Sequence, residues 1–115
     1  MKRLTAILLA LTVGTAAFAN ADDDIMARQA LMKQVGAAAK AGDLNALADA
    51  GAQALVAFRV DTTGQGSVET KAAANIWTDQ AGFEALLNEM VTAARAGDRD
   101  ATFATCKTCH STYRK

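Results

Sequence analysis

No proline occurs anywhere in this chain of 115 residues, and alanine is abundant along it. Proline breaks helix interiors, whereas alanine favours a helix more than any other residue, so this composition permits long uninterrupted helices. Runs of β-branched residues, which strands favour, are absent after the apolar N-terminal segment. These features together predict an all-α fold.

Two glycine–aspartate pairs, Gly42-Asp43 and Gly97-Asp98, indicate where helices end and begin. Glycine readily adopts the left-handed conformation that follows many helices, and aspartate accepts hydrogen bonds from the free N–H groups that start the next helix. Each pair therefore predicts a tight turn between two helices. A glycine-rich segment without apolar side chains, DTTGQGS at residues 61–67, predicts a longer loop.

Apolar residues recur at steps of three, four or seven positions in several segments, as expected for amphipathic helices. The predicted helices are residues 22–41, residues from about 44 to 60, a segment that begins at Thr78 or Asp79 and ends before Gly97, and a segment after Asp98. Four such helices with two short connections and one longer connection predict an antiparallel four-helix bundle. Together they would form one small domain, residues 22–115.

The N-terminal segment has the three parts of a secretory signal peptide. Lys2 and Arg3 precede an apolar run, and two Ala-x-Ala triplets close it, which places cleavage after Ala21 or after Ala19. The alternative, a transmembrane anchor, needs about 20 apolar residues, and this run is shorter. We therefore predict a signal peptide at residues 1–21 and an exported, periplasmic protein that is not bound to the membrane.

The charge of the exported chain limits its partners. Removal of Lys2 and Arg3 with the signal peptide leaves 10 basic and 12 acidic residues. A nucleic-acid-binding domain would show a basic excess, so no nucleic-acid partner is expected. The chain also lacks the set of nucleophile, histidine and carboxylate that indicates catalysis, so no enzyme activity is predicted.

The residues best suited to ligand chemistry gather near the C-terminus, where Cys106, Cys109 and His110 are the two cysteines and the single histidine of the chain. A structural zinc site requires four ligands, and a thioredoxin-like pair requires a strand–helix–strand setting, so neither fits. Two alternatives remain, a disulfide between the cysteines of a haem-free exported protein and covalent attachment of a haem. The Cys-x-x-Cys-His spacing is typical of c-type haem, with two thioether bonds and iron ligation by the histidine.

The chain resembles class II cytochromes c, the cytochrome c′ family, which are four-helix bundles with the haem motif near the C-terminus. The matching pieces are spread over the chain after the signal peptide. They are Arg28-Gln29 with Met32-Lys33, GSVETKAAANIW at residues 66–77, Phe83, Gly97-Asp98, and CKTCHSTYR at residues 106–114. The resemblance implies an antiparallel bundle with one haem c attached through Cys106 and Cys109, and with His110 as an axial ligand. Compared with typical members, the first helix, the third helix and the run from Gly97 to Cys106 are shorter.

The face of the iron opposite His110 decides between two functions that the resemblance implies. The thioether candidates are Met26, Met32 and Met90, and the methionine of the Arg-Gln-x-x-Met-Lys pattern, here Met32, is the sixth ligand in the low-spin branch of the family. A His110/Met32 pair would make an electron-transfer carrier with a raised reduction potential. A vacant sixth position would instead give a high-spin cytochrome c′ that binds NO or CO.

Three further expectations concern the surroundings of the haem. Arg28, one helical turn before Met32, is expected near a haem propionate, with a solvated surface position as the alternative. Lys107, Arg114 and Lys115 form a small basic cluster that would suit an acidic periplasmic redox partner. The resemblance also implies a homodimer through the first two helices, as in many members of the family.

Overall fold

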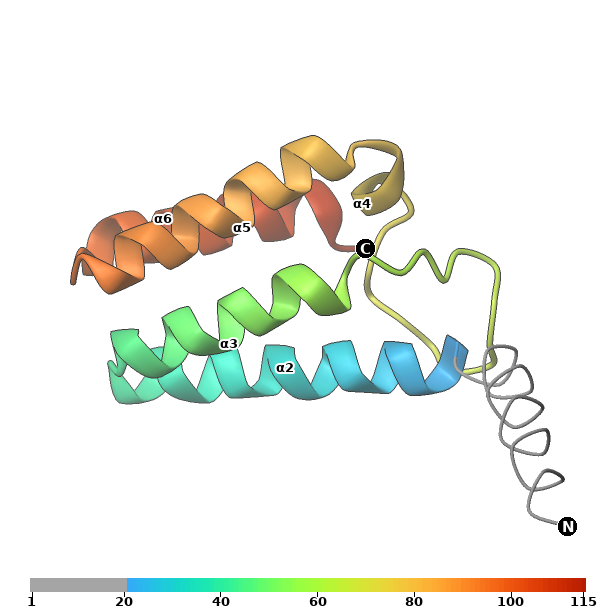
Figure 1. The fold of residues 1–115 in the computed structure, drawn as a ribbon, viewed down its shortest axis with the longest axis horizontal. Coiled ribbons are helices and arrows are strands. Elements are labelled where there is room, and N and C mark those ends of the chain that lie inside the picture. The colour runs from blue at the N-terminus through green and yellow to red at the C-terminus, as the bar shows by residue number, and fades with distance from the viewer. Residues whose placement is uncertain (1–20) are drawn as a thin grey trace, which may run out of the picture.

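The computed structural model describes residues 21–115, which contain five α-helices and no strand beyond one isolated β-bridge. The helices are α2 (Ala21–Ala41), α3 (Leu44–Ala57), α4 (Asn75–Thr78), α5 (Gln80–Arg95) and α6 (Arg99–Tyr113). The four long helices form a bundle in which α2 packs on α3, α3 on α5 and α5 on α6 (Figure 1). The predicted all-α four-helix bundle is confirmed. None of the described helices is long and apolar enough to cross a membrane, and the predicted signal peptide lies outside the described residues apart from Ala21.

Both predicted glycine–aspartate turns are present. Gly42 and Gly97 adopt positive φ angles of 71° and 75°, which glycine tolerates without strain. The side chains of Asp43 and Asp98 each accept a hydrogen bond from the backbone N–H three residues further along, with lengths of 3.0 and 3.1 Å. Because each turn reverses the chain within a few residues, the helices on its two sides pack against each other.

The connection between α3 and α5 is longer than predicted. α3 ends at Ala57, about one turn early, and residues 58–74 contain no helix before the short α4. The carbonyl oxygen of Val60, just beyond the end of α3, accepts a hydrogen bond of 3.0 Å from the side chain of Arg28. Asp79, one of the two predicted caps, starts α5 and accepts a backbone hydrogen bond of 3.3 Å from its first turn.

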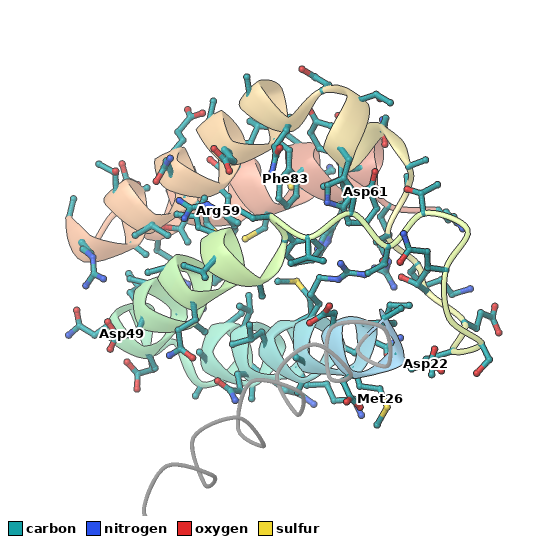
Figure 2. The ribbon with its side chains drawn as sticks, turned by 45° about the vertical axis from the view of Figure 1, so that its right-hand side comes forward. Asp22, Met26, Asp49, Arg59, Asp61 and Phe83 are labelled. Carbon is teal, nitrogen blue, oxygen red and sulfur yellow. The ribbon has the colours of Figure 1, made fainter. Side chains whose placement is uncertain are left out.

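An aromatic cluster joins the connection to α5 and α6. The ring centroids of Phe58 and Phe83 lie 5.1 Å apart, and those of Phe83 and Tyr113 lie 5.3 Å apart in an edge-on arrangement. All three side chains are buried, and Figure 2 shows Phe83 inside the bundle. Aromatic pairs in this geometry add to the free energy gained by burial. The cluster therefore holds one end of the bundle together.

The C-terminal end of α6 is bound to the same connection. The backbone N–H of Ala73 donates a hydrogen bond of 2.9 Å to the carbonyl of Tyr113, and the N–H of Lys115 donates one of 2.7 Å to the carbonyl of Lys71. In Figure 1 the C-terminus accordingly lies against the connection. These bonds fix the end of the helix that carries both cysteines and the histidine.

Candidate functional site

A cavity of about 540 Å³ lies between α2 and α6, the first and last long helices of the bundle, which do not share the close packing of the other neighbouring pairs. Further parts of its wall come from α5 and from the connection. All five residues predicted from the sequence to form the site line this cavity. They are Arg28, Met32, Cys106, Cys109 and His110. The volume falls within the range of small-molecule and cofactor sites.

Most of the other side chains that line the cavity are apolar. They include Ile25, Val35, Phe58, Phe83, Leu86 and Leu87. Exposed residues such as Lys33 and Gly36 line it as well, so the cavity reaches the protein surface. An apolar chamber with an opening suits a large apolar ligand that carries polar groups at one edge.

Cys106 and Cys109 lie one turn apart on α6, are half-buried and are not joined in a disulfide. Burial raises the pKa of Cys106, and burial together with the neighbouring Cys106 raises the pKa of Cys109 to about 11. Both groups are therefore neutral thiols at neutral pH. The Sγ atom of Cys106 lies 3.3 Å from the Sδ atom of Met90, so this thiol packs against α5.

His110 follows Cys109 directly on α6 and lines the cavity, although much of the residue is exposed. Partial desolvation lowers the pKa of its imidazole, and the positive charge of Arg114, one turn later, lowers it further. Both effects favour the neutral imidazole, which is the form that ligates a metal. One helix thus presents two thiols and a neutral imidazole to the same chamber.

The three candidate methionines differ in their position relative to the cavity. Met26 is 55% exposed and points away from the bundle (Figure 2). Met90 lines the cavity but belongs to α5 and contacts Cys106, on the wall next to the cysteines. Met32 lines the cavity from α2, on the wall formed by the helix that does not pack on α6. Met32 is therefore the methionine placed across the cavity from the helix of His110.

Arg28 is buried, so the alternative of a solvated surface position is wrong. Only 2% of the residue is exposed, and its side chain donates hydrogen bonds of 3.0 Å to the carbonyl of Val60 and 2.6 Å to the hydroxyl of Thr62. The guanidinium also lies 5.3 and 5.1 Å from the ring centroids of Phe58 and Trp77. Burial lowers its pKa.

No carboxylate lies within ion-pair distance of Arg28 in the described part of the chain, although the charges of Asp24 and Asp61 are near enough to raise its pKa against the larger effect of burial. Buried charges in proteins are normally paired, because an isolated charge loses its hydration without compensation. Arg28 also lines the cavity. This arrangement therefore favours a ligand that brings a negative charge to this part of the wall.

Two residues that the sequence analysis did not assign to the site also shape it. The hydroxyl of Tyr113 donates a hydrogen bond of 2.6 Å to the carboxylate of Asp79, which raises the pKa of Tyr113 to about 12. Tyr113 lines the cavity and Asp79 caps α5, so this bond fixes α6 against the start of α5. Lys71 reaches the cavity from the connection, where no helical periodicity could have indicated its position.

No family model matches the chain, and no curated protein sequence matches it. Among solved structures, the chain is similar to cytochrome c prime from Shewanella frigidimarina, with a TM-score of 0.51. The two share 21% sequence identity, and the match covers 85% of this chain and 98% of the other. At this identity the likeness establishes a common fold. It agrees with the four-helix bundle formed by residues 21–115.

Proposed function

We propose that this protein is a class II cytochrome c, an exported mono-haem carrier that transfers single electrons in the periplasm. The observation that carries the proposal is the cavity between α2 and α6, which is lined by Cys106, Cys109 and His110 from one helix and by Met32 and Arg28 from the other. The likeness to a cytochrome c prime supports it. No catalytic role is proposed, because the histidine is assigned to the iron.

The residues of the cavity fit one haem c. Cys106 and Cys109 would form the two thioether bonds, since both thiols are free and lie one turn apart on one helix. His110 would ligate the iron through its neutral imidazole. The apolar walls would exclude water from the macrocycle. When bound, the haem supplies the reversible one-electron chemistry of its iron.

Met32 is the proposed sixth ligand, because it lines the cavity from the helix across from His110. A thioether ligand favours reduced iron and raises the reduction potential, which suits an electron carrier. The alternative is a high-spin iron with Met32 packed nearby but not bonded. Val35 and Leu86 also line the cavity, and such apolar surroundings would favour small neutral gases such as NO or CO.

Arg28 is proposed to bind a haem propionate. A guanidinium carries five N–H donors, and Val60 and Thr62 occupy donors on Nη1 and Nη2, so further donors are free for a carboxylate. Hydrogen bonds between charged groups are the stronger kind, and the propionate would form the direct charged contact that neither Asp24 nor Asp61 makes with Arg28. The role of Arg28 is therefore to orient the haem and compensate its charge.

The proposal includes a periplasmic redox partner and a homodimer formed through α2 and α3. Two of the exposed large apolar side chains, Met26 and Val56, lie on these helices, with exposed fractions of 55% and 62%. A second copy would cover them. Sedimentation of the purified protein tests this point, since a dimer is expected at micromolar concentration and a monomer under the same conditions would contradict it.

The visible absorption spectrum of the protein, exported by a host that attaches c-type haem, tests the proposed function. A sharp reduced α band with a weak far-red methionine–iron band is expected for the His110/Met32 carrier. A broad reduced band that changes on addition of CO would support the high-spin alternative. Absence of a Soret band would contradict both and leave a haem-free protein with a Cys106–Cys109 disulfide.

A further inference from the structure

The charged residues that line the cavity are all lysines or arginines. They are Arg28, Lys33, Lys71 and Arg114, and no aspartate or glutamate of residues 21–115 is among the lining residues. Composition does not explain this, since residues 22–115 contain more acidic than basic residues. Of the basic cluster predicted from the sequence, Arg114 alone belongs to the wall, whereas Lys107 and Lys115 do not.

Three of these cations are exposed at the opening, and we refer to Lys33, Lys71 and Arg114 as the basic rim. They come from α2, the connection and the C-terminus. Two contacts fix their segments together. The connection pairs with the C-terminus through the β-bridge between Ala72 and Arg114, and Gln29 of α2 donates a hydrogen bond of 2.9 Å to the carbonyl of Glu69. The basic rim is therefore a defined surface feature.

The acidic residue that pairs with the basic rim compensates little of its charge. Glu69 lies 3.8 Å from Lys71, but both side chains are largely exposed, with fractions of 89% and 67%. Exposed ion pairs of this kind contribute little free energy and are screened by salt. Even with Glu69 counted, the opening carries a positive charge on a chain whose exported part is negative overall.

We propose that the basic rim is the docking surface for a redox partner protein with an acidic face, which binds over the opening of the cavity. This inference rests on the proposed function, because the opening matters only if the cavity holds the haem. Complementary charge around such an opening raises association rates and orients the encounter, by factors of about 10 to 1,000 at low salt. The partner would thereby meet the haem at the opening rather than at another face.

The competing explanation is that the rim cations serve the haem propionates alone. A haem carries two propionates, and Arg28, which is buried and lacks an ion pair in the described chain, is the cation best placed for one of them. Three exposed cations then exceed what one remaining carboxylate requires. Loss of a propionate partner would change the reduction potential, whereas loss of a docking surface would change the salt dependence of the electron-transfer rate.

The test is stopped-flow reduction of the haem-loaded protein by flavodoxin hydroquinone, used as an acidic one-electron donor, over a range of ionic strength. Lys33→Glu/Lys71→Glu reverses two charges of the basic rim. Lys40→Glu/Arg95→Glu is the matched control, because it changes the net charge equally on exposed residues in the last turns of α2 and α5 that do not line the cavity. The rim variant should react at least tenfold more slowly at low salt, with the difference vanishing at high salt, while the control stays within about twofold of wild type.

A second measurement does not depend on electron transfer. On addition of oxidised flavodoxin, the amide NMR shifts of the haem-loaded protein should change around residues 33, 71 and 114 and not around residues 40 and 95. Equal slowing of both variants, or a changed reduction potential with an unchanged salt dependence, would overturn the basic rim as a docking surface. A wild-type protein without a Soret band would instead refute the proposed function itself, so the two failures are distinguishable.

Discussion

The Nη2 atom of Arg28 lies 2.6 Å from the Oγ1 atom of Thr62, and both residues are buried although 34 positions separate them in the chain. This bond joins α2 to the connection and holds a guanidinium in the wall of the cavity. The same side chain also donates a hydrogen bond to the carbonyl of Val60, just beyond the end of α3. One residue thus links the path of the connection to the proposed haem site.

Replacement of Arg28 should destabilise the protein. Arg28→Ala removes two hydrogen bonds of a charged donor and its contacts with Phe58 and Trp77, so the free energy of unfolding should fall by about 3 kcal/mol. Arg59→Ala is the matched control, because Arg59 is exposed and its ion pair with Glu84 is long, at 3.7 Å. That change should stay below about 0.5 kcal/mol. Urea unfolding measures both, and equal effects would contradict the structural role given to Arg28.

Three methionine variants test the proposed sixth ligand. Met32→Ala should convert the oxidised spectrum from low-spin to high-spin and lower the reduction potential, because the thioether is lost. Met26→Ala should leave the spectrum unchanged, since that side chain does not line the cavity. Met90→Ala should lower stability by about 2–4 kcal/mol while the iron stays low-spin, because Met90 is only 4% exposed and packs beside Cys106. A low-spin Met32→Ala protein would show that Met32 is not the ligand.

The contact between α3 and α5 requires glycine at position 51. A Cβ atom on Gly51 would lie 2.5 Å from Cε of Met90 and 2.9 Å from Cγ2 of Val91. Gly51→Ala should therefore cost about 1–3 kcal/mol, because a packed interior has to shift. Thermal unfolding of wild type and variant checks this, and an unaffected Gly51→Ala protein would contradict the packing.

Asp22, in the first turn of α2, should make the free energy of unfolding depend on pH in the acid range. The Asp22 carboxylate accepts hydrogen bonds from the N–H groups of Val68 and Ser67 and from the Ser67 hydroxyl, which lower its pKa. The unfolded chain, in which Asp22 titrates near its usual value of about 4, binds the proton more readily than the folded chain. The contribution of Asp22 is therefore present above that value and is lost as pH falls below it.

Asp22→Asn measures this contribution. Its unfolding free energy should lie below that of wild type at neutral pH, and the gap should close as pH falls from about 4 toward the lowered pKa of the folded state. Asp23→Asn is the control on the same turn, because the side chain of Asp23 is exposed, and no such closing gap is expected. A difference in unfolding free energy between wild type and Asp22→Asn that stays constant with pH would contradict the role given to the hydrogen bonds of Asp22 with Ser67 and Val68.

Local signals predicted the long helices, whereas tertiary contacts determined the connection. The glycine and aspartate of each tight turn act within a few residues, so their effect could be inferred from adjacent positions. The connection depends on partners far away in sequence, such as Arg28 for the carbonyl of Val60 and Tyr113 for the N–H of Ala73. No sequence periodicity encodes such pairs, and the length of the connection was therefore underestimated.

The candidate site could also be predicted only in part from the sequence. The cysteines and the histidine stand together in sequence, so their shared helix and shared cavity follow from a single motif. Met32 was singled out by resemblance, because its spacing alone is equally typical of an ordinary core residue. The burial of Arg28 and the position of Lys71 at the opening required the folded chain, since each depends on which segments meet at the cavity.

Intact-mass spectrometry of the denatured protein tests the central claim most directly, after export by a host that attaches c-type haem. We expect the mass of the chain without its signal peptide plus one haem, which should stay attached after acid and organic extraction. Cys106→Ala/Cys109→Ala should give the polypeptide mass alone under the same conditions. A wild-type mass equal to that of the polypeptide, or haem that extraction removes, would contradict the claim that these two cysteines bind a haem covalently.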